Sequence, residues 1–177
     1  MNKKIIYLSL YLAIITLLSG LILFGFDQLT RPKIEYQKQL KIKLSLKQVF
    51  PSASSFVQTK DNIFNALSGD NKIGVILKVV VKGYGGSMPM LVGIKNNKIM
   101  GVKILEHTET PGLGAIAVEN KHLTGKSFSF LGQFKMKNIR DKFKAKEDVV
   151  AITGATITSQ AIADGVKQAI SLYKSLK

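Results

Sequence analysis

The stretch Ala151–Ile162, AITGATITSQAI, gathers hydroxyl side chains around a single glycine. Three threonines and one serine lie within seven residues, at positions 153, 156, 158 and 159. A hydroxyl becomes a nucleophile only when a neighbouring base or a metal ion activates it. The stretch contains no acid, base or metal ligand. Its chemistry must therefore use the hydroxyls without local activation.

The flanking residues predict a strand, a tight turn and a helix. EDVVAI before the turn is a short apolar run, and after it the apolar residues recur at helical spacing, at Ile162, Val166, Ala169, Ile170 and Tyr173. Thr158 or Ser159 suits the N-cap, which puts Thr156 just before the helix. A helix N-terminus presents free N–H groups and a positive dipole end, which together favour phosphate. A plain capping turn remains the alternative at this point.

The composition excludes several kinds of redox and catalytic centre. The chain of 177 residues has no cysteine, which excludes disulfides, thiolate catalysis and cysteine-ligated clusters. Its two histidines, His107 and His122, lack the spacing of a metal pair, so we predict no metal site. Redox chemistry would require an organic cofactor. The glycines of GYGGSMPMLVG do not have dinucleotide-binding spacing, so we expect no bound NAD.

Residues 5–26 form 22 consecutive uncharged, mostly apolar positions. As a helix they would extend roughly 33 Å, enough to cross a bilayer. A cleaved signal peptide is the alternative, but the run is long and has no clear cleavage pattern. The basic residues on its two sides are nearly balanced, so charge alone does not fix its orientation.

The formal charge is +15, from 26 Lys and Arg against 11 Asp and Glu. With a membrane anchor, anionic lipid or an acidic protein surface is a better partner than nucleic acid. Residues 121–146 mix eight cations with Phe128, Phe130, Phe134 and Phe143. We interpret this pattern as aromatics entering a core beneath solvated lysines, and we expect no nucleic-acid binding.

The remainder predicts a mixed α and β domain. A helix should leave the membrane and end at Pro51, and Lys72–Val81 should form a strand followed by the glycine-rich loop GYGGS. The Asn96-Asn97 pair between two apolar runs predicts a hairpin. In HTETPGLG, Pro111-Gly112 predicts a turn, and Gly114 would let the backbone pass close to another group.

Several motifs together resemble those of a known family. They are LTRPKI after the anchor, GYGG, LVGIKNNKIMGVKILEHTETPGLG, FLGQF and TGATITS, and they extend over nearly the whole chain. In this combination the chain resembles the G subunit of the Rnf complex. It more distantly resembles the C subunit of the sodium-translocating NADH:quinone reductase.

The resemblance implies an α+β FMN-binding domain, with a sheet flanked by helices, behind one N-terminal transmembrane helix. The boundaries would be residues 1–29 for the anchor and 30–177 for the flavin domain. The resemblance also implies FMN joined through its phosphate to Thr156, in a reaction performed by a separate flavin transferase that uses FAD. The other implied cofactor-binding residues are Thr153, Gly154, Ala155, Ile157, Thr158, Glu109, Thr110 and Leu113. In the family an aspartate often stands three residues before the first motif hydroxyl, and here Val150 occupies that position.

The implied function is electron relay in a complex that couples ferredoxin and NAD redox chemistry to ion transport. The chain would be a single-pass inner-membrane subunit with its flavin domain on the extracytoplasmic side. It would work with other membrane subunits and have no catalytic residues of its own. Two alternatives remain: a stand-alone membrane flavoprotein for electron transfer, and a flavin-free basic subunit for assembly or lipid binding.

Overall fold

The computed structural model describes residues 3–119 and 129–176. The chain divides into two compact units, Met1–Lys41 and Ile42–Lys177. In order the elements are α1 Lys3–Val49, β1 Ser55–Lys60, β2 Ile63–Ser68, β3 Asn71–Lys82, β4 Ser87–Lys95, β5 Lys98–Ile104, α2 Gly114–Val118, the 3-10 helix η1 Leu131–Phe134 and α3 Thr156–Lys174.

The described residues of the first unit, 3–41, are all helical and belong to α1. The most apolar 18-residue window of α1 has a mean hydropathy of 2.3, and none of that window is buried. Its length and composition suffice to cross a membrane, and fit the predicted single-pass protein. The predicted exit helix is also confirmed, because α1 ends at Val49, two residues before Pro51.

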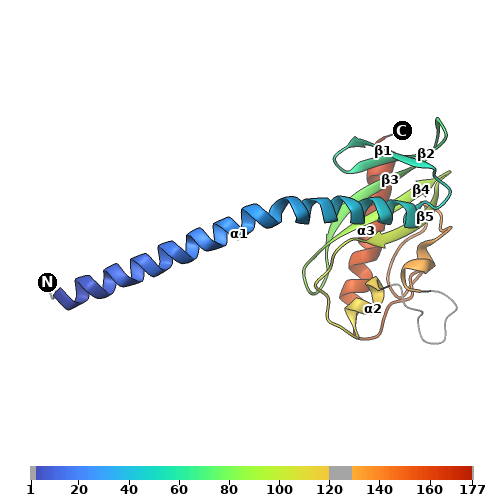
Figure 1. Ribbon diagram of the computed structural model, residues 1–177. Coiled ribbons are helices and arrows are strands. Elements are labelled where there is room, and N and C mark those ends of the chain that lie inside the picture. The colour runs from blue at the N-terminus through green and yellow to red at the C-terminus, as the bar shows by residue number, and fades with distance from the viewer. Residues whose placement is uncertain (1–2, 120–128, 177) are drawn as a thin grey trace. The chain divides into compact units, whose positions relative to one another are not determined.

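The second unit is built on a five-stranded antiparallel sheet in the order β1-β2-β3-β4-β5 (Figure 1). The predicted hairpin is confirmed: Asn96 and Asn97 have φ of 49° and 61° and join β4 to β5. Two positive φ values in a two-residue turn define type I′, which asparagine tolerates. The predicted strand at Lys72–Val81 lies within β3. β1 and β2 were not predicted.

Helical segments cover both faces of this sheet. Alternate residues of β3 point in opposite directions, so Val75, Leu77 and Val79 join the cluster against α3. Ile76 joins a smaller cluster on the other face, with Leu46 and Val49 from the end of α1. The predicted helical stripe is confirmed, because Ile162, Val166, Ala169 and Ile170 of α3 are all buried. The fold class is α+β, as predicted.

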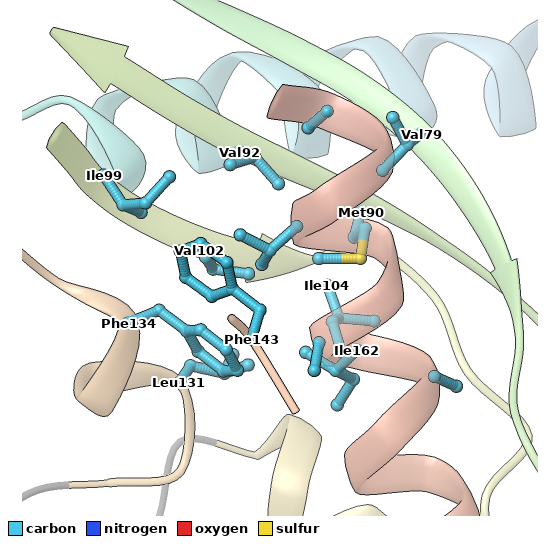
Figure 2. Packing of buried hydrophobic residues seen from close by; sticks show 14 of the residues in the cluster. Val79, Met90, Val92, Ile99, Val102, Ile104, Leu131, Phe134, Phe143 and Ile162 are labelled. Carbon is cyan, nitrogen blue, oxygen red and sulfur yellow. The ribbon is translucent and has the colours of Figure 1, made fainter. Parts of the chain in front are cut away.

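Three of the aromatics in the basic tract enter the core, as predicted. Phe130, Phe134 and Phe143 are buried, and Figure 2 shows Phe134 and Phe143 beside the sheet residues Val102 and Ile104. The ring centroids of Phe134 and Phe143 are 6.3 Å apart, and the rings are stacked. Phe128 and His122 lie outside the described residues.

The predicted strand at EDVVAI is wrong. The stretch forms a turn and an extended segment, with one isolated bridge between Ala145 and Val149. Its backbone is held by side chains: the Gln133 amide accepts from Val150 N at 2.8 Å and donates to Val150 O at 3.2 Å. Ser159 Oγ accepts from Ile152 N at 3.1 Å. Side-chain hydrogen bonds thus replace a strand ladder, which apolar periodicity does not reveal.

Asp148 organises the loop before this segment. Its carboxylate accepts hydrogen bonds from Phe143 N and Lys144 N, at 2.9 and 2.7 Å, and lies 3.5 Å from Lys137 Nζ. Burial pushes the pKa of Asp148 upward, but these N–H groups and the Lys137 ammonium outweigh it, so the net shift is downward. Asp148 therefore stabilises the conformation of this loop.

We expect Asp148→Asn to lower the free energy of unfolding at neutral pH by about 1–3 kcal/mol, because charge-assisted hydrogen bonds are lost. Because the pKa of Asp148 is lowered in the folded state, its carboxylate contributes fully to the free energy of unfolding above the unfolded-state pKa of about 3.9. This stabilising contribution is lost as the pH falls through the folded-state pKa. Urea unfolding of both proteins in detergent, at pH 7 and at pH 3, measures this difference. Asp70→Asn, at an exposed turn, is the control and should change little. An equal difference at both pH values would contradict the assignment.

Candidate functional site

A pocket of about 540 Å³ opens beside the first turn of α3. Three separate stretches of the chain meet there: the β3–β4 loop, residues 109–114 and residues 154–158. The pocket is lined by Tyr84, Glu109, Thr110, Leu113, Gly114, Gly154, Ala155, Thr156, Ile157 and Thr158. Its volume is in the range of small-molecule and cofactor sites.

Eight of the nine predicted site residues line this pocket. Thr153 does not; it is exposed in the turn that precedes α3. Sequence reasoning did not select Tyr84 as a site residue, although it noted the glycine-rich loop that contains it. It noted close backbone approach at Gly114, and the structure confirms this: a Cβ there would collide with the Glu109 carboxylate.

The turn into α3 depends on Gly154. Ala155 N donates to Ile152 O at 3.0 Å, and Gly154, the third residue of this turn, has φ of +78°. That conformation is strained for residues with a Cβ. The TGAT motif therefore turns the chain sharply and starts the helix at Thr156.

The predicted N-cap is wrong. The cap position is Ala155, which has no side-chain cap hydrogen bond, and Thr158 and Ser159 lie inside the helix. Ser159 Oγ donates to Ala155 O at 2.9 Å, one turn back along the helix. The first N–H groups of a helix have no intrahelical partner, and in α3 the cap residue makes no side-chain hydrogen bond to them and the first turn has no acid. This end of α3 therefore suits an anion.

Thr156 and Thr158 occupy different environments although they are two residues apart. Thr156 is exposed at the pocket edge, beside Ile157, whose side chain is also exposed. Thr158 is 1% exposed, and its Oγ1 donates to Glu109 Oε2 at 2.7 Å. One hydroxyl is accessible to a reagent, and the other is committed to a buried hydrogen bond.

Glu109 connects the three stretches that form the pocket. Its Oε2 accepts from Thr158 on α3, and its Oε1 accepts from Gly85 N in the β3–β4 loop at 3.0 Å. The neighbouring Thr108 strengthens the second connection, because its Oγ1 donates to Gly85 O at 2.7 Å. Glu109 is 5% exposed. A buried carboxylate with hydrogen bonds at both oxygens has a fixed position.

The predicted Pro-Gly turn is confirmed, and it places Leu113 at the pocket mouth. Leu113 N donates to Thr110 O at 3.2 Å, and Gly112 has φ of +77°. This is the arrangement of a type II turn with Pro111 at its second position. Leu113 is 44% exposed, and its Cδ2 lies 3.0 Å from where a Cβ on Gly154 would stand. An apolar side chain therefore borders the pocket next to the TGAT turn.

Val150 and Asp148, which precede the TGAT motif, do not line the pocket. Val150 is half-exposed, with its backbone bound to Gln133, and it does not line the cavity. The carboxylate of Asp148 accepts hydrogen bonds from the backbone N–H groups of residues 143 and 144. Among the described residues, no group of three or more His, Asp or Glu side chains could hold a metal ion.

Comparison with known proteins identifies the family. The FMN-binding domain family matches residues 83–171, which contain all of the described residues that line the pocket. The G subunit of the proton-translocating ferredoxin:NAD(+) oxidoreductase complex of Clostridium ljungdahlii is 35% identical, over 96% of this chain and 91% of that protein. The G subunit of the Na(+)-translocating complex of Acetobacterium woodii is 30% identical, over 98% and 94%.

Among solved structures, NqrC of Shewanella oneidensis is similar with a TM-score of 0.46 and 20% identity, over 73% of this chain and 74% of that one. The uncapped start of α3 fits a phosphate, and the pocket beside it can hold a ring system. FMN, which has both parts, is therefore the cofactor that the site fits. The chain belongs to the FMN-binding domain family and, within it, to the G subunits of the Rnf-type ion-translocating oxidoreductase complexes.

Proposed function

We propose that this chain carries FMN in phosphoester linkage to Thr156, and that it relays electrons in a membrane complex. As in the complexes for which its relatives are named, ferredoxin and NAD redox chemistry would be coupled to ion translocation. The observation that carries the proposal is the exposed hydroxyl of Thr156, on the first turn of an uncapped helix, at the edge of the pocket.

The residues of the pocket have separable roles in this proposal. Thr156 tethers the phosphate, and the N–H groups of residues 156–158 stabilise its charge. Gly154 and Ala155 shape the turn, while Thr153 stands just outside it. Glu109, Thr110 and Leu113 form the wall that the ring would meet, together with Tyr84 from the β3–β4 loop. Bound FMN supplies reversible electron uptake, which no side chain of this chain provides.

The described lining of the pocket offers no base to activate Thr156. The only carboxyl group in that lining is that of Glu109, and both of its oxygens are engaged by Thr158 and Gly85. A separate flavin transferase would therefore provide the base. In that reaction Thr156 Oγ1 forms a bond to the FMN phosphorus of FAD, the pyrophosphate bond breaks, and AMP leaves. The hydroxyl proton passes to the transferase.

The proposed topology is one membrane anchor in residues 1–29 and an extracytoplasmic flavin domain in residues 30–177. In support, the run of uncharged, mostly apolar residues ends at Phe26, and the second compact unit begins at Ile42. Residues 27–41 would then be a helical connection between the inner membrane and the domain. The other membrane subunits of the complex would be the partners.

We expect Thr156→Val to abolish covalent attachment of FMN while preserving the fold. Valine keeps the size and the β-branching but lacks the oxygen that forms the ester. The full chain should be co-expressed with a flavin transferase, and its intact mass and tryptic peptides measured. The wild-type protein should gain the mass of one FMN on the peptide that contains Thr156. FMN on Thr158 or Ser159, or on no residue, would falsify the assignment.

Thr158→Val is the matched control for this experiment. It removes a hydroxyl two residues away and should leave the attachment site intact. Its cost should appear in stability, because Glu109 loses a buried hydrogen-bond donor, worth about 1–3 kcal/mol. Loss of FMN from Thr158→Val in a folded protein would show that the two hydroxyls do not have separate roles.

We expect the flavin domain to be degraded when protease is added to intact spheroplasts. The anchor should remain in the membrane as a fragment of about the size of α1. A cytoplasmic protein that stays intact in the same sample verifies that the membrane is sealed. A domain that is protected until detergent is added would place it on the cytoplasmic side.

A further inference from the structure

The pocket has an unusual charge for a chain of this composition. The protein carries a formal charge of +15, yet no Lys or Arg is among the described residues that line the pocket. Glu109 is the one carboxyl group in that lining, and among the described ion pairs none involves it. A cofactor in this pocket would therefore meet one charged side chain among the described lining residues, and that charge is negative.

This charge is held in place rather than free to move away. Thr158 Oγ1 and Gly85 N fix the two oxygens at 2.7 and 3.0 Å. Gly83 and Gly114 lie so close that a Cβ on either would collide with the carboxylate. With 5% exposure, solvent screens the charge weakly. Its effect on a neighbouring group is accordingly larger than that of a surface carboxylate.

A structural role alone does not require the charge. A glutamine side chain could accept from Gly85 N through its oxygen and donate to Thr158 Oγ1 through its amide, because a hydroxyl both donates and accepts. Both connections between the loops would then survive without the negative charge. Packing and charge can therefore be separated at this position by a nearly isosteric substitution.

We propose that the buried Glu109 carboxylate, clamped between Thr158 and Gly85, is the fixed charge that lowers the reduction potential of the flavin in this pocket. The proposal rests on the proposed function, namely FMN attached at Thr156. Each electron that the flavin receives from a donor carrier adds negative charge beside an existing one, which Coulomb repulsion disfavours. Glu109 itself neither gains nor loses an electron. The flavin is thereby made a stronger donor to the next carrier.

The test is a spectroelectrochemical titration of the full-length, flavinylated protein in detergent. Wild type, Glu109→Gln and Glu106→Gln are compared after intact mass has shown one FMN on each. Glu106 is exposed and three residues away, so its variant removes the same charge from a solvated position. We expect a higher midpoint potential in Glu109→Gln and an unchanged one in Glu106→Gln. Equal potentials in all three proteins would overturn the proposal.

A second variant guards against poor folding of Glu109→Gln. Glu109→Leu combined with Thr158→Val removes the charge and its hydroxyl donor together, so that neither of these two groups is left buried and unpaired. It should show the same upward shift in potential. If both neutral variants fold but carry no FMN while Glu106→Gln does, Glu109 serves attachment rather than tuning, and the proposal fails. A wild-type chain without FMN on Thr156 would instead refute the proposed function.

Discussion

The candidate site depends on one buried carboxylate. Glu109 joins the start of α3 through Thr158 and the β3–β4 loop through Gly85. Its own loop is closed by the hydrogen bond from Leu113 N to Thr110 O. Thr108 joins the same two loops a second time, because its Oγ1 donates to Gly85 O. Burying a carboxylate is unfavourable unless its oxygens are satisfied, and here both are. The cavity is therefore built around a polar contact rather than around the hydrophobic core.

The core positions the parts that Glu109 connects. Buried residues of α3 pack on β3 and β4, and this contact fixes the helix axis relative to the sheet. On the opposite face, the end of α1 packs on the sheet through Leu46 and Val49. Within the described part of the chain, the segment before the TGAT turn belongs to no strand, and Gln133 and Ser159 hold it by side-chain hydrogen bonds. The first turn of α3 is thus held both by the packing of the helix on the sheet and by the hydrogen-bonded segment that precedes it.

The sequence patterns correctly predicted those parts of the fold whose conformation is determined by residues close together in the chain. The Asn96-Asn97 hairpin, β3, the apolar stripe of α3 and the burial of Phe134 and Phe143 all follow from short-range propensity or periodicity. β1 was missed because its residues are mostly exposed and give little periodic pattern. β2 was missed because apolar residues occupy alternate and intervening positions alike, at Ile63, Phe64, Ala66 and Leu67, so its sequence does not alternate. The strand at EDVVAI and the cap at Thr158 were wrong for a related reason. In both places a partner distant in sequence, Gln133 or Glu109, determines the conformation, and no local pattern contains it.

The spacing of the two threonines follows from the geometry of a helix. With 3.6 residues per turn, positions 156 and 158 are about 200° apart around the axis, so they point to nearly opposite sides. Thr156 is accordingly exposed at the pocket edge, and Thr158 is buried against Glu109. A T-x-T pattern on the first turn of a helix can therefore offer one hydroxyl to an external reagent while the other secures the helix to the pocket wall. The same two residues would be equivalent in an extended strand, where positions i and i+2 share a face. The early start of α3 at Thr156 is what makes them different.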